Sequence, residues 1–247
     1  MGKGREVISL FSGAGGLDIG FKQAGFNIAV AVEQDPSCCN TLRLNNPDLT
    51  VVEGDVSKIS TVDILKAANL APLEAALVIG GPPCQSFSLA GKRMGMDDER
   101  GMLILEFSRV IHEALPKAFV MENVKGMLNW EKGRALEAIL NEFKEPVIFE
   151  GNEYHYEVSY QVLNAVSYGV PQRRERLFIV GNRIDKSFTF PAPTHGTIKE
   201  LDLLSPQLQP YKTAWDAFGD LPPADEPSEA AKRVSKSIKG RIEKHGY

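Results

Sequence analysis

The chain has 247 residues, of which 43% are hydrophobic, and its formal net charge is −4. This length and composition suffice for one sizeable α/β domain with a smaller appendage, and they exclude a chain that is disordered over most of its length. The acidic charge excludes a protein that grips nucleic acid over its whole surface, so we expect any such contact to be local.

Short apolar runs alternate with helical patterns through the first half of the chain. The run at 7–11 is followed by the glycine-rich turn Ser12-Gly13-Ala14-Gly15-Gly16 and by apolar residues at helical spacing, which indicates strand, turn and helix. Strands that alternate with helices favour a mainly parallel sheet with right-handed crossovers. The predicted strands are 7–11, 28–32, 51–52, 77–79 and 118–121, and helices are predicted to begin near residues 17, 36, 62 and 102.

The pattern changes after a predicted helix at 134–143. Two strands at 158–163 and 176–180 are expected to extend the sheet as an antiparallel pair. We therefore predict an α/β domain over residues 1–190.

Residues 191–247 are predicted to form a linker or docking segment, because prolines become frequent there. An apolar patch at Trp215, Phe218 and Leu221 and a basic stretch from 230 to 247 interrupt it. A charge run of this kind is usually a solvated face.

No apolar run approaches the roughly 20 residues that a membrane-spanning helix needs, and the N-terminus leads directly into a strand. Cys38, Cys39 and Cys84 form no C-x-x-C pair, so neither a disulfide framework nor a zinc site is indicated. We expect a cytoplasmic protein with no membrane contact and no metal.

Polar or glycine-rich features fall at the ends of five predicted strands. Ligands of such sheets bind beyond the carboxyl ends of the strands, so these features are expected to face one crevice. Glu33 follows the first glycine of the turn by about 20 residues, where a ribose-binding carboxylate belongs. The five features are the turn at 12–16, Glu33, Asp55, Cys84 and Glu122.

Cys84 follows the strand at 77–79 and the sequence Gly80-Gly81-Pro82-Pro83, which ends the strand in a turn. A lone cysteine is more often a buried apolar residue than a nucleophile. Here the stiff proline pair and the polar residues Gln85, Ser86 and Ser88 favour a nucleophile, which must react as the thiolate.

Six motifs in sequence resemble those of the DNA cytosine-5 methyltransferases, from Val7 to about Asn182. The glycine turn alone is weak evidence, because Asp18 stands at the third glycine of G-x-G-x-x-G. The resemblance implies a Rossmann-like, S-adenosylmethionine-dependent methyltransferase fold. The motifs are Phe11-Ser12-Gly13-Ala14-Gly15-Gly16, Glu33, Asp55, Pro82-Pro83-Cys84-Gln85, Glu122-Asn123-Val124 and Gln172-Arg173-Arg174-Glu175-Arg176.

The resemblance implies S-adenosylmethionine as the cofactor and S-adenosylhomocysteine as the product. Phe11 would face the adenine, Glu33 would accept from the ribose hydroxyls, and Asp55 from the adenine amino group. The N–H groups of the glycine turn, at a helix N-terminus, suit the cofactor's carboxylate. The expected cofactor-binding residues are Phe11, Ser12, Gly13, Ala14, Gly15, Gly16, Leu17, Glu33, Gln34, Asp55, Val56 and Pro82.

The resemblance also implies the reaction. Cys84 would add to carbon 6 of cytosine, so that carbon 5 becomes nucleophilic enough to take the methyl group. Glu122 would give a proton to N3, and must hold it near neutral pH although a free glutamate titrates near about 4.3; burial behind the strand at 118–121 would help. Arg174 would contact the base and the cysteine adduct, and Arg176 would brace either Glu122 or the loop that carries Cys84.

A cytosine inside duplex DNA is out of reach, so the resemblance implies that the base is flipped out. The loop from Pro83 to Gly101 is suited to close over it, and we expect this loop to be mobile without DNA. The expected DNA-binding residues are Gln85, Ser88, Lys92, Arg93, Arg100 and Arg173.

Family members usually continue into a target-recognition region and a Gly-Asn motif that completes the cofactor site. Neither is found in this sequence, which favours the catalytic subunit of a split bacterial modification enzyme over a truncated chain. A second polypeptide would then supply both, and the Trp215 patch with the basic stretch would be its docking surface.

Three other functions stay open. An RNA cytosine-5 methyltransferase would use the same chemistry, but the Cys-Phe-Thr signature of the tRNA-modifying branch is absent. A nicotinamide dehydrogenase would leave Cys84 and Glu122 without a role. A non-catalytic DNA-binding subunit would not need either residue.

Overall fold

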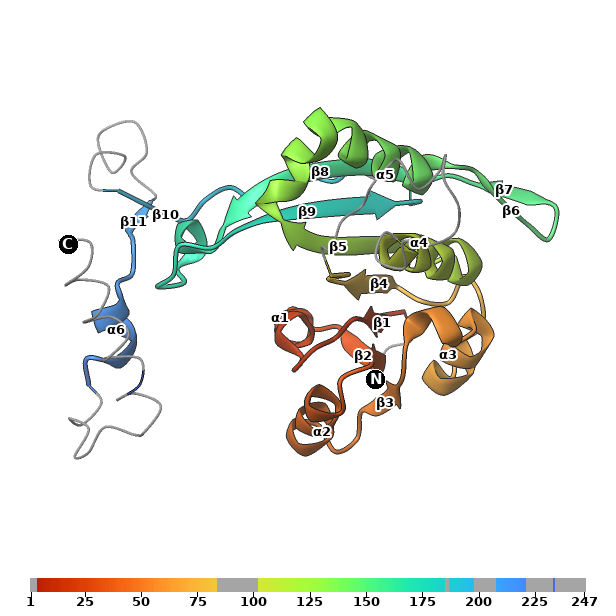
Figure 1. Ribbon diagram of the computed structural model, residues 1–247, viewed down its shortest axis with the longest axis horizontal. Helices are drawn as coiled ribbons and strands as arrows, with labels where there is room; N and C mark the ends of the chain where they lie inside the picture. Colours follow the sequence, from red (N-terminus) through yellow and green to blue (C-terminus); the bar gives the residue numbers. More distant parts are fainter. Residues whose placement is uncertain (1–3, 84–101, 185–186, 198–207, 221–232, 234–247) are drawn as a thin grey trace.

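The computed structural model describes residues 4–83, 102–184, 187–197, 208–220 and 233, and Figure 1 shows their arrangement. Its centre is a seven-stranded sheet in the order β3-β2-β1-β4-β5-β9-β8. The strands are β1 (Glu6–Leu10), β2 (Asn27–Glu33), β3 (Thr50–Glu53), β4 (Leu77–Gly80), β5 (Ala118–Val124), β8 (Glu157–Asn164) and β9 (Glu175–Asn182).

The sheet is mixed but mostly parallel. Strands β1 to β5 pair in parallel, whereas β9 runs antiparallel to β5 and β8 antiparallel to β9. The predicted strands and the predicted antiparallel extension are confirmed. The hairpin of β6 (Val147–Phe149) and β7 (Asn152–Tyr154) was not predicted.

The strand order reverses between β1 and β4. The chain runs outward through β2 and β3, then returns to place β4 on the other side of β1, where Leu10 is paired with Gly80. A reversal of this kind opens a crevice at the carboxyl ends of the two strands. The glycine turn after β1 and the Gly81-Pro82-Pro83 turn after β4 therefore lie side by side.

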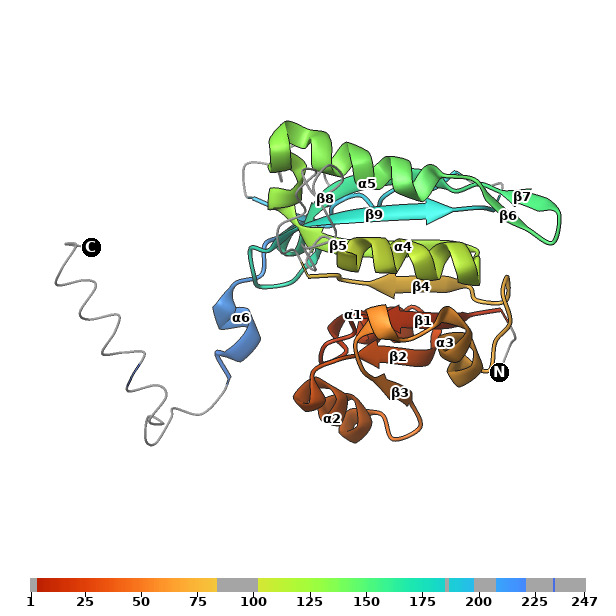
Figure 2. The same cartoon turned by 45° about the vertical axis from the view of Figure 1, so that its right-hand side comes forward.

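Helices cover both faces of the sheet (Figures 1 and 2). The larger core packs α3, α4 and α5 against one face, and a smaller core packs the apolar side of α1 against the other. Asp35 caps α2 through the N–H groups of Ser37 and Cys38, with Pro36 in the first turn. The helices are α1 (Gly16–Gln23), α2 (Pro36–Asn45), α3 (Thr61–Ala68), α4 (Met102–Ala114) and α5 (Arg134–Lys144).

The larger core contains an aromatic cluster beneath β5. Phe119 contacts Phe107, Phe143 and Tyr156, with ring centroids 4.7 to 6.4 Å apart. Gly181 on β9 leaves the space for Phe119, because a Cβ atom there would lie 2.1 Å from the phenylalanine ring. This packing fixes β5 and β9, which carry residues of the crevice.

The C-terminal part that the structure describes extends away from the sheet (Figure 2). It consists of β10 (His195–Gly196), β11 (Gln209–Pro210) and the short helix α6 (Ala214–Phe218). Trp215 is 76% exposed and Phe218 is also exposed, whereas Leu221 lies outside the described residues. Among the described helices, none is long and apolar enough to cross a membrane.

Candidate active site

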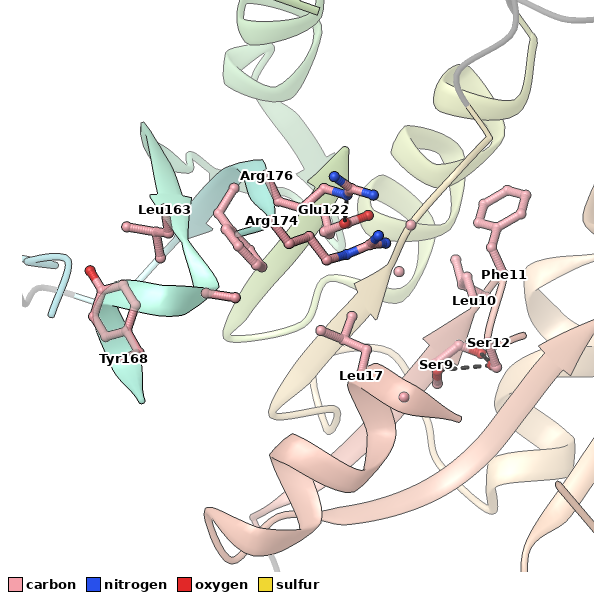
Figure 3. Close-up of a pocket in the computed structure, with 15 residues that line it drawn as sticks. Ser9, Leu10, Phe11, Ser12, Leu17, Glu122, Leu163, Tyr168, Arg174 and Arg176 are labelled. Carbon is pink, nitrogen blue, oxygen red and sulfur yellow. Dashed lines mark hydrogen bonds and ion pairs between the residues drawn. The ribbon is translucent and has the colours of Figure 1, made fainter. Parts of the chain in front are cut away.

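A pocket of about 540 Å³ opens at the crevice between β1 and β4 (Figure 3). The ends of β1 and β4 form one wall, and β5, β8 and β9 form the other. Apolar groups make most of its lining, with charge supplied from β5 and from the β9 region. Its lining includes Ser9, Phe11, Ser12, Leu17, Gly81, Glu122, Tyr168, Arg174 and Arg176.

A second pocket, of about 210 Å³, lies at the ends of β2 and β3. It is lined by Phe11, Glu33, Gln34, Asp55 and Val56, so five of the predicted cofactor residues come together there. Phe11 and Gly81 line both pockets, which therefore meet at these residues.

Phe11 holds a conformation that non-glycine residues rarely adopt. Its φ angle is 52°, in the left-handed region, directly after β1 ends. Such conformations cluster at ligand sites, where the surroundings hold them in place. Here the conformation sets the ring between the two pockets.

The glycine turn bends tightly into α1. Gly13 and Gly15 have φ angles of 53° and 87°, and a Cβ atom at Gly15 would lie 2.9 Å from Leu42 on α2. The N–H of Gly13 donates to Glu33 Oε2 at 2.7 Å. This donor was expected to serve a bound anion, but in this structure it holds the Glu33 carboxylate instead.

Glu33 is fixed by three backbone donors. Besides the Gly13 contact, its Oε1 accepts from the N–H groups of Gln34 and Asp35, both at 2.9 Å. A carboxylate has about four lone-pair sites, so acceptor capacity remains for a ligand hydroxyl. Its orientation is therefore set before any ligand binds.

Asp55 caps the short 3₁₀ helix Val56–Lys58 after β3. Hydrogen bonds from Ser57, including its N–H at 3.0 Å, lower the pKa of the Asp55 carboxyl. An ionised carboxylate can only accept hydrogen bonds, so the side chain suits an amino group of a ligand.

Glu122 on β5 and Arg176 on β9 form an ion pair within one wall of the larger pocket. Arg176 Nε lies 2.8 Å from Glu122 Oε1. Figure 3 shows Arg174 on the same side of β9, as the alternation of side chains along a strand predicts. Glu175 points the other way and pairs with Lys125 at 2.8 Å.

The expected burial of Glu122 is not found, since 26% of its side chain is exposed. Its second oxygen faces the turn after β4, because a Cβ atom at Gly81 would lie 3.1 Å from Oε2. Glu122 therefore lies between the turn after β4 and the two arginines Arg174 and Arg176.

Sequence reasoning gave no individual role to Asn123, which lies beside Glu122 and is buried. Its side-chain amide donates to the carbonyl oxygen of Pro82 at 3.1 Å. This bond joins the end of β5 to the proline turn. The signal in the sequence was its place in the motif Glu122-Asn123-Val124, directly after a strand-end acid.

A polar cluster beneath the glycine turn was also not foreseen. Ser9, Ser12 and Asp18 are buried together and joined by hydrogen bonds. Desolvation by burial raises the pKa of Asp18. Polar residues inside the apolar patterns of β1 and α1 were the available signal.

Some of the remaining predicted site residues lie within the described part of the chain and others lie outside it. Pro82 and Pro83 are described, Pro83 lines the smaller pocket, and Arg173 and Ala14 are exposed. No group of three His, Cys, Asp or Glu that could hold a metal occurs in the part of the chain that the structure describes. Cys84, Gln85, Ser88, Lys92, Arg93, Arg100 and the predicted loop motion lie outside the described residues.

The sequence profile of the C-5 cytosine-specific DNA methylase family matches residues 5–244. Type II methyltransferase M.AquIA of Picosynechococcus sp. is 66% identical over 246 residues, which are 98% of this chain and 99% of the relative. M.NgoPII of Neisseria gonorrhoeae is 40% identical over 200 residues, which are 81% of this chain and 54% of that relative. This chain therefore spans the whole of one relative and about half of the other.

Solved structures share the fold. A protein described as an E. coli prophage DNA modification methyltransferase superposes with a TM-score of 0.68 at 31% identity, covering 89% of this chain and 56% of that one. The Dnmt2 methyltransferase of S. pombe, at 20% identity, gives a TM-score of 0.54 and covers 74% of this chain and 51% of its own.

Proposed function

Because this chain belongs to the C-5 cytosine-specific DNA methylase family and is thus a DNA methyltransferase, we propose that it methylates carbon 5 of cytosine in duplex DNA. The observation that carries this proposal is the meeting of two pockets at Phe11 and Gly81. One has the acceptors that a nucleoside needs, and the other has the charged pair that a reacting base needs.

The smaller pocket would hold the adenosine part of S-adenosylmethionine, the cofactor that the family implies. Glu33, already oriented by three N–H groups, would accept from the ribose hydroxyls. Asp55, an acceptor with a lowered pKa, would accept from the adenine amino group. Phe11 would cover the adenine ring, and the methionine part would extend into the larger pocket.

The larger pocket would receive the cytosine, flipped out of the duplex. Cys84 would follow the turn at Gly81, and its thiolate would add to carbon 6. Glu122 would place a proton on N3, so that the negative charge of the ring is neutralised and carbon 5 becomes nucleophilic. S-adenosylmethionine supplies the electrophilic methyl group.

The residues of β9 would hold the reacting groups in place. Arg176 would orient Glu122 through the 2.8 Å ion pair, and Arg174 would contact the base from the same face. Loss of the carbon 5 proton would then release the Cys84 sulfur from carbon 6. Gln85, Ser88, Lys92, Arg93, Arg100 and Arg173 would contact the DNA.

We further propose that a second polypeptide completes the enzyme. A curated methyltransferase matches this chain over 99% of its length, whereas another relative is about twice as long. We expect the second polypeptide to correspond to the half of the longer relative that this chain does not match. It would supply target recognition and the last part of the cofactor site. The pair would act as the modification half of a restriction-modification system, and residues 191–247 would link or dock the two polypeptides.

A trapping experiment tests the reaction. Duplex DNA containing 5-fluorocytosine should form a covalent complex with the protein, assayed together with the proposed second polypeptide, when S-adenosylmethionine is present. Carbon 5 then carries fluorine in place of the proton whose loss would release Cys84. Cys84→Ser should abolish the complex. Methyl transfer to tRNA but not to DNA would overturn the choice of substrate.

A further inference from the structure

Arg109 on α4 ties that helix to the turn that follows β3. Its Nη2 donates to the backbone oxygens of Val56 at 2.9 Å and of Ile59 at 3.1 Å. Its Nη1 donates to Oγ1 of Thr61, a buried residue at the start of α3, at 2.9 Å. One guanidinium group therefore holds both ends of the connection between the 3₁₀ helix and α3.

Two glutamates on α4 hold the guanidinium group in its orientation. Nε of Arg109 donates to Glu106 Oε2 at 2.6 Å, and Nη1 also donates to Glu113 Oε2 at 3.3 Å. An arginine has five N–H donors in one rigid plane, so the five contacts use all of them. The side chain of Arg109 is only 27% exposed, so these contacts are largely shielded from water.

The turn that Arg109 holds forms part of the smaller pocket. Asp55 and Val56 line this pocket, and Arg109 binds the carbonyl of Val56 itself. Leu103 lines the same pocket and comes from α4, the helix that carries Arg109. Arg109 lines neither of the two pockets, but its contacts fix the position of the turn relative to α4.

The two acceptors of the smaller pocket are positioned by different groups. Glu33 is held by three backbone N–H groups, none of which belongs to the segment that Arg109 contacts. The pKa of Asp55 is lowered by hydrogen bonds from Ser57 and by the charge of Lys58. Arg109 therefore acts on the position of Asp55 rather than on its charge.

We propose that Arg109 is a positioning residue that makes the smaller pocket selective for a base with an exocyclic amino group. This inference rests on the proposed function, since it concerns the adenosine part of the same cofactor. Arg109 keeps the turn in place, so that the Asp55 carboxylate meets the amino group of the base. The contact of Glu33 with the ribose does not depend on Arg109.

Binding of two probes to the full chain tests this role. The probes are S-adenosylhomocysteine and its purine analogue, which carries hydrogen in place of the adenine amino group. The native chain should bind the first about tenfold or more tightly than the second. Arg109→Lys keeps the charge but loses the planar set of donors. It should bind S-adenosylhomocysteine about tenfold more weakly, and the purine analogue less than about twofold more weakly.

A double variant tests whether Arg109 acts through Asp55. Asp55→Asn should by itself remove most of the preference for the amino group. Arg109→Lys added to Asp55→Asn should then change the ratio of the two affinities by less than about twofold, because coupled residues are not additive. Losses that multiply in the double variant would show that Arg109 acts on another group, and would overturn the inference.

Two control variants separate positioning from general stability. Arg43→Lys alters another arginine beside β3, which pairs with Glu53 at 2.7 Å outside both pockets, and it should leave the affinity ratio unchanged. Tyr156→Phe removes the buried hydrogen bond to the carbonyl of Pro116 and should lower the melting temperature without changing the ratio. An equal fall of the ratio in Tyr156→Phe and Arg109→Lys would assign the effect to destabilisation.

The outcomes distinguish this inference from the proposed function. If the native chain binds neither probe, the cofactor assignment fails and this inference with it. If the native chain binds both probes equally, Asp55 does not read the amino group and the inference is wrong. If Arg109→Lys weakens both probes equally or neither, the proposed function stands and the role of Arg109 is wrong.

Discussion

The side-chain amide of Asn123 donates to the carbonyl of Pro82 at 3.1 Å, and so joins the end of β5 to the turn that precedes Cys84. One residue earlier, Glu122 forms its ion pair with Arg176. Two consecutive residues of β5 therefore make these contacts: Asn123 binds the proline turn, and Glu122 binds Arg176. These two contacts hold the proline turn and the Glu122 carboxylate in fixed positions relative to β5.

Asn123→Ala should lower kcat by about tenfold or more while the affinity for S-adenosylhomocysteine stays within about twofold, because small displacements of reacting groups are costly in rate. Steady-state methylation kinetics and a binding titration measure the two effects. Asn152→Ala, on the exposed β6–β7 hairpin, is the control. An unchanged kcat in Asn123→Ala would show that the turn holds its position without the amide.

Glu122→Gln should reduce the methylation rate by about 10²–10⁴, the usual contribution of a general acid. Arg176→Gln should reduce it by about tenfold or more, since Glu122 would lose its partner. Glu175→Gln is the matched control, because Glu175 lies on the same strand but faces Lys125 on the opposite side. Single-turnover methylation measures all three, and an equal loss in Glu175→Gln would contradict the assignment.

Gly80→Ala should destabilise the protein by about 2–3 kcal/mol, because overpacking of a tight core site has roughly this effect. The added Cβ atom would lie 2.5 Å from the backbone oxygen of Leu10 and 2.9 Å from Phe107. Gly20→Ala, within α1 and with no atom in the way, should instead stabilise by about 0.5–1 kcal/mol. Urea unfolding measures both changes, and equal effects would refute the steric argument.

The stability of the ligand-free protein should depend on pH through Asp18. Burial raises the pKa of Asp18 above its ordinary value of 3.8, so the folded protein binds the proton more tightly than the unfolded chain. This contribution is fully present below pH 3.8 and is lost as the pH rises through the folded pKa. The melting temperature of the native protein minus that of Asp18→Asn should therefore fall across this window, and a difference that rises with pH would contradict the shift.

The contribution of Asp55 to the stability of the folded protein changes with pH in the opposite direction. Its pKa is lowered by the hydrogen bonds from Ser57, so its stabilising contribution is present above pH 3.8 and is lost as the pH falls through the folded pKa. Asp55→Asn should remove this loss in acid unfolding curves. The affinity of the Asp55→Asn protein for adenosine should also fall by about tenfold, since the asparagine amide is a weaker acceptor than the carboxylate.

Trp215→Ser and Phe218→Ser should weaken assembly with the proposed second polypeptide and leave binding of S-adenosylhomocysteine unchanged. Both residues lie on α6, away from the two pockets, and are exposed. Leu44→Ser, on α2 and 81% exposed, is the matched control. Co-purification of the polypeptide encoded beside this chain measures assembly, and equal recovery with all three variants would exclude the patch.

The sheet could be predicted because its strands are short apolar runs that end in polar residues. The alternation with helices indicated parallel pairing, and the strand-end rule gathered Glu33, Asp55 and Glu122 at one edge. The strand order was not predictable, because no local pattern says that β4 returns to the side of β1. Glu122 was expected to be buried, but its exposure depends on β9, which lies more than 50 residues later.

Other misses have local causes. The β6–β7 hairpin turns at Glu150 and Gly151, which both have positive φ angles, and a glutamate at the first position carries none of the usual Asn-Gly signal. Asp18 was noted only as an exception to a glycine motif, because its contact with Ser9 crosses the turn. The backbone N–H of Gly13 was expected to bind the cofactor's carboxylate, but it donates to the side chain of Glu33.

The two pockets meet at Phe11 and Gly81, and this has a consequence for inhibitor design. A single molecule that joins adenosine to a pyrimidine through a short linker would occupy both pockets at once. Each half would raise the effective concentration of the other, so the joined compound would bind far more tightly than either fragment. The optimal linker length would then report the distance between the two pockets in solution.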